Sequence, residues 1–316
     1  MNKPILLAIL LLVNTYVKSQ EKNAQRLIEE VTTTLVNNQL SPEILKIEQA
    51  SGFTKGKLNP DNGNTINQFQ QSTFAISAFP FTIVKKQNTQ LFMGLGYQTQ
   101  IFNQFATMNA DSVFAKNIQS AYLGTALIIK YNNHIFWQNY LQTGFYGRKP
   151  FENVDKTFNI QFVSKLNYKP NRDLNYGIGL AYFSNMGEPL ILPAVSVTYS
   201  QPHWLIDVNF PIKTEIEGIM VHGILRPVAG ISYHGGNYYL SNNQYLYNFG
   251  ALGYLGMRFK LMDMVYMYSA YQVGVFDAYK FGTSHQLSKL GNYSGQSQFV
   301  ISLNIQAPTF IPRLQH

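Results

Sequence analysis

The chain contains no cysteine among its 316 residues. It therefore has no disulfide, no metal–thiolate site and no thiol nucleophile. Beyond its N-terminal segment it also lacks any apolar stretch that approaches the length of about 18 residues expected of a membrane-spanning helix. Charged residues are scarce as well, at 13% of the sequence. These absences exclude thiol chemistry and a helical membrane protein, and such a low charge would be unusual on the surface of a soluble domain.

The charges that are present do not form a patch. Lys and Arg number 24 and Asp and Glu number 16, but the basic residues are scattered and never occur three in a row. Nucleic-acid-binding proteins concentrate their cations on one face, so no nucleic-acid partner is predicted. Aromatic residues are abundant instead. The 21 Tyr and 22 Phe suit a barrel with aromatic girdles at both membrane interfaces.

The N-terminus predicts export. Lys3 supplies a short positive region, residues 5–13 form an apolar run, and Val17-Lys18-Ser19 provides a small-residue exit before Gln20. This order is typical of a removable signal peptide, which we place at residues 1–19. Its removal takes away two lysines and lowers the net charge from +8 to +6. Because no cysteine follows the apolar run, a lipid-anchored product is excluded.

Residues 20–42 are predicted to form a short N-terminal leader. Its apolar residues recur at helical spacing and the pattern ends at Ser41-Pro42; they are Leu27, Ile28, Val31 and Leu35. A helix at this position would either plug the lumen of a barrel or pack in the periplasm at the barrel mouth, because a helix this short needs tertiary support.

Period-two alternation dominates the remainder of the chain, residues 43–316. In the segment 158–168 one face carries Phe158, Ile160, Phe162, Ser164, Leu166 and Tyr168, and the other carries Asn159, Gln161, Val163, Lys165 and Asn167. Similar alternation recurs over 91–101, 174–182 and 298–306. It continues without a break from Trp204 to Glu217, which predicts one long strand there.

This alternation predicts an all-β fold, a transmembrane antiparallel up-and-down β-barrel of about 12 strands with a range of 10 to 14. A closed barrel satisfies every backbone polar group in lipid without a helix. A soluble, secreted β-sandwich is the alternative fold. A barrel of about 12 strands lies between filled barrels of 8 and aqueous porins of 16 to 18, so we expect a narrow or plugged channel.

The connections predict an orientation in the membrane. Tight turns are expected at 132–133, 170–173, 185–187 and 201–202, where Asn, Asp, Gly and Pro favour turn dihedrals. Longer polar stretches run over 103–117 and 282–296. Since periplasmic turns of such barrels are short and extracellular loops are long, we expect the tight turns in the periplasm.

No catalytic, cofactor-binding or metal-binding residue is predicted. A barrel hydrolase needs a serine and a histidine together on the outer wall, with a third group that orients the histidine. Of the six histidines, only His234 shares a strand face with a nearby serine, Ser232, and no acidic orienter accompanies them. No histidine pair has metal-ligand spacing with a third ligand nearby.

The face opposite the apolar one predicts a charged lumen. If the apolar side chains contact lipid, the inward charges are Lys165, Lys169, Asp207, Lys213, Glu215, Glu217, Arg258 and Lys260. Such mixed charges form either a selective constriction or a static network of salt bridges, and both interpretations remain open.

The segments ILPAV (191–195) and YSQPHWLIDVNFP (199–211) carry a family resemblance. A strand that ends in tyrosine and a proline-bearing hairpin lead into tryptophan, alternating apolar residues and a further proline. This arrangement resembles the central signature of an uncharacterised family of porin-like outer-membrane β-barrels. A weaker similarity is to barrel subunits of the type IX secretion system, although the Asn-Pro-Ala-type opening expected there is missing. The resemblance implies an outer-membrane barrel and assigns no catalytic residue.

Two functions follow as hypotheses. The first is porin-like passage of small polar solutes across the bacterial outer membrane, with lipid as the surrounding partner and no cofactor. The second is a structural or partner-binding barrel subunit of an outer-membrane assembly such as a secretion system, for which protein partners cannot be named from the sequence.

Overall fold

The computed structural model describes residues 43–55, 68–104, 117–171, 173–184, 189–220, 224–241, 243–262, 265–283, 286–293 and 297–306. The predicted signal peptide and leader, and most of the first long polar stretch, 103–117, lie outside the described residues. The second stretch, 282–296, is not a loop throughout, because residues 286–293 form a strand that pairs with residues 277–283. Within the described part, no helix is long and apolar enough to cross a membrane.

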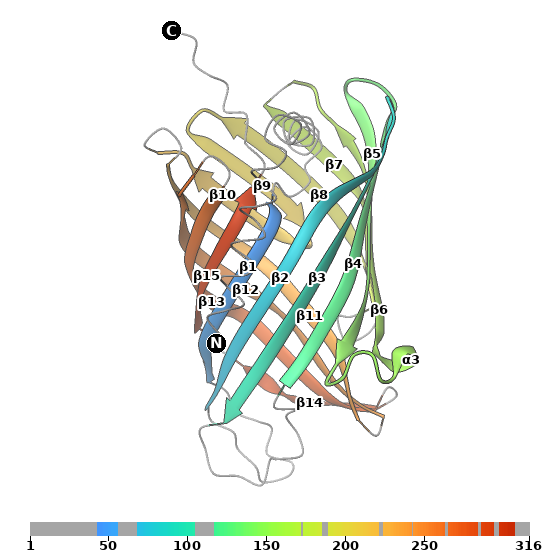
Figure 1. The fold of residues 1–316 in the computed structure, drawn as a ribbon, viewed down its shortest axis with the longest axis vertical. Coiled ribbons are helices and arrows are strands. Elements are labelled where there is room, and N and C mark those ends of the chain that lie inside the picture. The colour runs from blue at the N-terminus through green and yellow to red at the C-terminus, as the bar shows by residue number, and fades with distance from the viewer. Residues whose placement is uncertain are drawn as a thin grey trace, which may run out of the picture.

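The described chain consists almost entirely of strands, which tilt around one closed wall (Figure 1). They are β1 Glu43–Lys55, β2 Gln68–Lys85, β3 Thr89–Gln104, β4 Asn117–Lys130, β5 Ile135–Gly147, β6 Phe158–Tyr168, β7 Leu174–Phe183, β8 Leu190–Gln201, β9 Trp204–Phe210, β10 Lys213–Gly218, β11 Leu225–Ser241, β12 Gln244–Lys260, β13 Val265–Thr283, β14 Gln286–Tyr293 and β15 Ser297–Gln306. A four-residue helix, α3 (Val154–Thr157), lies between β5 and β6.

Antiparallel pairing closes the barrel. Each strand from β1 to β13 pairs with the next, β13 pairs with β15 over Val265–Val273, and β15 pairs with β1. Strand β14 pairs with the far part of β13, so fourteen of the fifteen strands form the ring. The predicted all-β, up-and-down barrel is confirmed, and its strand number lies at the upper end of the predicted range.

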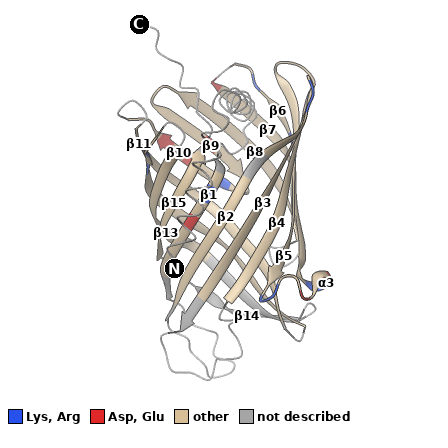
Figure 2. Cartoon of the chain, in the orientation of Figure 1, with Lys and Arg blue, Asp and Glu red and all other residues tan. Residues whose placement is uncertain are grey.

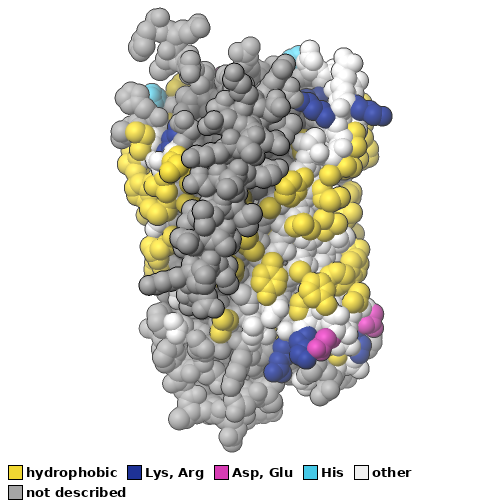
Figure 3. Space-filling view, viewed as in Figure 1, with side chains coloured by type: hydrophobic (Ala, Val, Ile, Leu, Met, Phe, Trp, Pro, Cys, Tyr) yellow, Lys and Arg dark blue, Asp and Glu magenta, His cyan; other side chains and the backbone are white. Residues whose placement is uncertain are grey.

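The predicted division into an outer and an inner face is also confirmed. In β6, Leu166 is 51% exposed on the outside, whereas its neighbour Asn167 is fully buried on the inside. Apolar side chains cover much of the visible outer surface (Figure 3). Most of the wall carries no charged residue, and acidic residues, drawn in red, lie on β10 (Figure 2). A closed barrel with an apolar outer surface and a polar inner one is the architecture of outer-membrane β-barrels.

The expected long strand from Trp204 to Glu217 is wrong. Two strands occupy this region, β9 and β10, joined by a tight turn in which the Ile212 N–H donates to the Asn209 carbonyl and the Phe210–Pro211 peptide is cis. Because Asn209 pairs with Lys213, the loop holds three residues. With an odd number of loop residues, odd-numbered residues face the lumen on both strands, so the alternation continues across the turn. Alternation alone therefore could not reveal the turn. Pro211 was the available signal, since proline cannot donate a ladder hydrogen bond and is uncommon within central strands.

The two ends of the barrel differ. One end, here the short-turn end, holds the turns 86–88, 131–134, 169–173 and 202–203 and the beginning of β1. The other, here the α3 end, holds the connections that include α3 and the long loops. The turn expected at 185–187 lies outside the described residues, and the strands that flank it, β7 and β8, end and begin at the α3 end.

At the α3 end the wall draws together. Strand β10 pairs with β11 only over Val228–Ser232, and beyond that β11 reaches β5, where Tyr239 and Gly147 form a parallel bridge. The Arg148 N–H donates to the Tyr239 carbonyl over 2.9 Å. A Cβ on Gly147 would lie 2.6 Å from that carbonyl oxygen, so the close approach requires glycine. The β5–β6 connection and α3 thus dock onto the end of β11.

The orientation can be tested with epitope tags. We expect a tag inserted after Asn153, beside α3, to be labelled on intact cells, and a tag inserted after Asn132 to be labelled only after the outer membrane is opened. Labelling at Asn132 in intact cells would reverse the orientation. Heat-modifiable migration on gels would show that each tagged barrel has folded.

Candidate functional site

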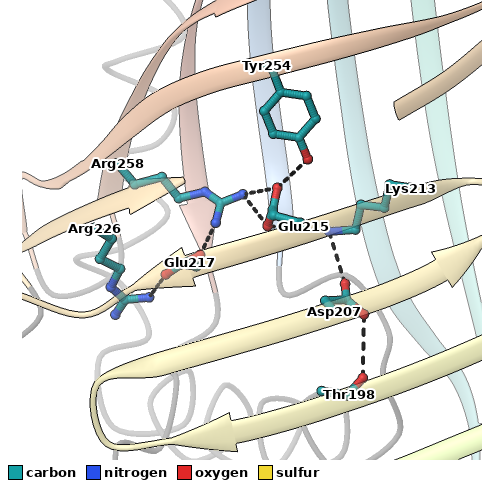
Figure 4. A network of polar contacts seen from close by, with 8 residues as sticks. All are labelled: Thr198, Asp207, Lys213, Glu215, Glu217, Arg226, Tyr254 and Arg258. Atoms are coloured by element: carbon teal, nitrogen blue, oxygen red, sulfur yellow. Dashed lines mark hydrogen bonds and ion pairs between the residues drawn. The ribbon is translucent and has the colours of Figure 1, made fainter. Parts of the chain in front are cut away.

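Six charged side chains of the inner face meet on four neighbouring strands, β9 to β12 (Figure 4). From the predicted set, Asp207, Lys213, Glu215, Glu217 and Arg258 form one connected network. Three further members were not predicted: Thr198, Arg226 and Tyr254. Each occupies an inward position, but the register that brings it to a partner on another strand cannot be read from one strand's own pattern.

Glu217 is the centre of this network. Its carboxylate is 3% exposed and accepts from the guanidinium of Arg226 over 3.1 Å and from that of Arg258. The Arg226 guanidinium also donates to the Tyr266 hydroxyl, and its centre lies 4.9 Å from the centroid of that ring. Two cations thus share one buried carboxylate, and an aromatic face stabilises one of them.

Glu215 extends the network along β10. Its carboxylate accepts from Arg258 at 2.9 Å and from the Tyr254 hydroxyl at 2.8 Å, and the Lys213 ammonium lies 3.7 Å away. Lys213 also pairs with Asp207 on β9 at 3.2 Å. These contacts join the six-residue strand β10 to its neighbours β9 and β11 and also to β12. The three carboxylates of the network are balanced by its three basic side chains. Within this cluster the charges form a network of salt bridges.

Lys165 differs from the other predicted charges. It projects inward from β6, is 5% exposed, and donates to the side-chain carbonyl of Asn209 over 2.9 Å. In the described part of the chain it forms no ion pair. A buried ammonium whose hydrogen-bond partner is neutral is costly, and the attraction of the Asp207 carboxylate opposes that cost. An ionisable residue within a membrane-spanning segment is for this reason a candidate functional group.

Lys169 and Lys260 are the remaining members of the predicted set. Both are half-buried and stand at the short-turn end, where the Lys169 N–H donates to the His134 carbonyl and the Lys260 N–H to the Ile224 carbonyl. The predicted set therefore divides into one buried cluster, Lys165 beside it, and two lysines at the rim.

Apart from Lys46 and Glu48, which form an ion pair on β1 over 2.7 Å, the remaining described inner face carries neutral side chains. Tyr140 donates to Gln142, which donates to Tyr146, over 2.8 and 2.9 Å. Buried amides and hydroxyls line the other strands, among them Gln71, Gln100, Gln138, Asn175, Asn248 and Ser302. No group of three His, Asp or Glu side chains within the described ranges is placed to hold a metal ion. The described lumen wall is thus lined largely by buried polar side chains.

Comparison with known families decides the affiliation. A family model described as a domain of unknown function (DUF6268) matches residues 51–232, which is more than half of the chain. The chain belongs to this family. The segment matched by the DUF6268 model includes Lys165, Asp207, Glu217 and Arg226, whereas Arg258 lies beyond it. No curated protein matches the sequence.

Solved barrels are similar at low identity. The NanC porin is 9% identical, with 82% of this chain and 99% of that chain covered and a TM-score of 0.36. The translocator domain of the autotransporter NalP from Neisseria meningitidis is 13% identical, with 92% and 98% covered and a TM-score of 0.38. Outer membrane phospholipase A from Escherichia coli is 13% identical, with 84% and 97% covered and a TM-score of 0.36. At such scores these similarities carry no argument about function.

Proposed function

We propose that this outer-membrane barrel allows small polar solutes to pass, and that Lys165 is the charge that they meet in the lumen. The observation that carries the proposal is the buried ammonium of Lys165, which has a neutral hydrogen-bond partner and no ion pair among the described residues. The acidic residues nearby are already matched by Lys213, Arg226 and Arg258. The unbalanced charge of this wall is therefore positive, which favours anionic solutes.

Buried amide oxygens support a hydrated path. The side-chain oxygens of Gln71, Gln100 and Gln138 face inward and have no hydrogen-bond partner in the described structure. Buried polar atoms are normally satisfied, by water when protein groups do not reach them. Water or the hydroxyl groups of a solute would satisfy these three oxygens. Such a path is narrow, in keeping with the burial of the inner side chains.

Ion selectivity tests the role of Lys165. In planar bilayers we expect Lys165→Gln to lower the anion-to-cation permeability ratio by about fivefold, the effect of one unit charge at contact distance in water. Lys149→Gln, which removes an exposed lysine beside α3, is the matched control and should leave the ratio unchanged. An unchanged ratio in Lys165→Gln channels of normal conductance would contradict the proposal.

A partner-binding barrel is the second candidate, because the inner side chains are buried and most of the lumen charges neutralise one another. Folded protein that carries no current in planar bilayers would favour this role. It also predicts co-purifying proteins that are lost when residues 21–39, part of the proposed leader, are deleted. A lone monomer in mild detergent before and after deletion would count against it.

We propose no enzymatic activity for the barrel. Ser232 and His234 lie on the same, inward face of β11 as the buried residues Val228 and Gly236. A barrel hydrolase needs its serine and histidine on the outer wall. For export we propose the cleaved signal peptide 1–19, which N-terminal sequencing of the membrane-inserted protein would test.

A further inference from the structure

A groove crosses the outer wall of the barrel over β1 to β6, on the face opposite to the lumen. Its volume is about 510 Å³, within the range of ligand-binding pockets. Leu95, Tyr97, Ala121, Thr143, Phe145 and Phe158 are among its lining residues. The register explains the hollow: Tyr97, Ala121, Phe145 and Phe158 are successive cross-strand partners on β3 to β6. The small Ala121 lies in a row of aromatic side chains and forms the floor.

The groove belongs to the part of the wall that faces lipid. Leu95 is 60% exposed and Phe158 46% exposed, and both point away from the lumen. A hollow in a lipid-facing wall is filled by lipid, because an empty one forfeits the dispersion contacts of its lining and water finds no polar partner there. Its shape is elongated, since it follows the row of paired residues across six strands. That shape suits an acyl chain rather than a compact solute.

The groove descends to the α3 end, where the chain gathers aromatic and basic residues. The rings of Phe151 and Phe158 lie 5.7 and 5.8 Å from that of Phe145, and all three line the groove. Arg148 and Lys149 lie in the same connection between β5 and β6. Basic and acidic side chains lie side by side below the apolar band in this region (Figure 3), and in residues 148–156 three basic residues outnumber two acidic ones. Arg148 is exposed and forms no ion pair within the described ranges, whereas Lys149 pairs with Glu152.

We propose that this groove is a binding site for one anionic, phosphate-bearing membrane lipid. Its acyl chain would lie on Ala121 between Tyr97 and Phe145, and its phosphate would be held by Arg148 and Lys149. The apolar trough supplies the fit to the chain, and the two cations supply the preference for negative charge. The site is separate from the lumen, so it stands or falls independently of solute passage.

Lipid retention in detergent tests the site. Purified protein would be given dioleoyl phosphatidylglycerol or dioleoyl phosphatidylcholine, which share their acyl chains and differ in net charge, and bound lipid would be counted by native mass spectrometry. We expect one retained phosphatidylglycerol per barrel and a preference over phosphatidylcholine of about fivefold for each cation that contacts the headgroup. The double variant R148Q/K149Q should bind the two lipids equally.

Filling the groove separates the role of its shape from that of the charge. Ala121→Trp should reduce retention of both lipids by about tenfold, since the indole occupies the floor of the groove. Val273→Trp is the matched control, because Val273 is 43% exposed on the outer face of β13 and does not line the groove. If Ala121→Trp impairs folding, Ala121→Leu replaces it with a smaller expected reduction.

Three results would overturn the lipid site. The first is retention by Ala121→Trp equal to that of Val273→Trp, and the second is the absence of a preference for phosphatidylglycerol in the unaltered protein. The third is a dimer that Ala121→Trp converts to a monomer while lipid binding stays the same, which would assign the groove to an interface between two copies of this chain.

Discussion

Replacing Glu217 by Gln is expected to cost the folded barrel about 3–5 kcal/mol of unfolding free energy, the usual effect of removing one partner from a buried ion pair. The amide cannot balance the guanidiniums of Arg226 and Arg258, which both contact this carboxylate and remain buried after the substitution. Urea titration in lipid vesicles would measure the loss. Tryptophan fluorescence reports it well, because one of the two tryptophans, Trp204, lies on β9 and pairs with the end of β10.

Glu152→Gln is the matched control. This carboxylate also pairs with a cation, Lys149, but its side chain is 57% exposed, so the change should cost no more than about 1 kcal/mol. A second comparison separates two causes of the loss in stability: the lost attraction between the partners, and the cost of leaving a buried charge without a partner. The double variant E217M/R226M removes one pair of opposite charges and leaves Arg258 bound to Glu215. It should be more stable than Glu217→Gln, because well-packed apolar groups often replace a buried ion pair at little cost. Equal stability of Glu217→Gln and Glu152→Gln would mean that the network does not hold β10 in place.

Replacing Gly179 by Ala is expected to cost about 1–3 kcal/mol, as overpacking of a closely fitted site does. A Cβ at this position would overlap the carbonyl oxygen of Ser164 on β6, and a backbone atom cannot move aside without disturbing the β6–β7 pairing. Stability in urea and the yield of refolded, heat-modifiable barrel would both measure the effect. Larger side chains such as valine should lower both further.

Gly253 on β12 provides the control for this prediction. A Cβ there would meet its nearest atom, Cγ2 of Val275, at 3.5 Å, which is ordinary van der Waals contact. Gly253→Ala should therefore be neutral or slightly stabilising, since alanine loses less backbone entropy on folding than glycine. If Gly253→Ala lost as much stability as Gly179→Ala, any alanine in these strands would be destabilising, and the overlap with Ser164 would not explain the effect at Gly179.

The inner and outer faces of single strands could be predicted because they depend only on neighbours along the chain. Lys165, Asp207, Glu215, Glu217 and Arg258 were assigned to the inside from alternation, and the pairing of β6, β9, β10 and β12 places them there. Which of them meet could not be predicted. Arg226 reaches Glu217 because β11 pairs with β10 in one register, and a shift of a single residue would turn Arg226 toward lipid.

The three-residue turn at Phe210–Ile212 shows the same limit at the level of the fold. Its odd length keeps the alternation intact, so the local pattern is the same for one long strand and for two short ones, and only Pro211 distinguishes them. The lipid groove likewise needs the register of β3 to β6, because Tyr97, Ala121 and Phe145 are far apart in the sequence. Neither feature has a signal within a single strand.

The sequence by itself determined the barrel class, the apolar outer face and the polar inner face, because the pleat of a strand sends successive side chains to opposite sides. Only the tertiary structure decided the number of strands, the sharing of Glu217 between two arginines, the isolation of Lys165 from any ion pair in the described structure, and the hollow over Ala121. These features depend on register and closure, which bring together residues from different strands that local alternation does not relate.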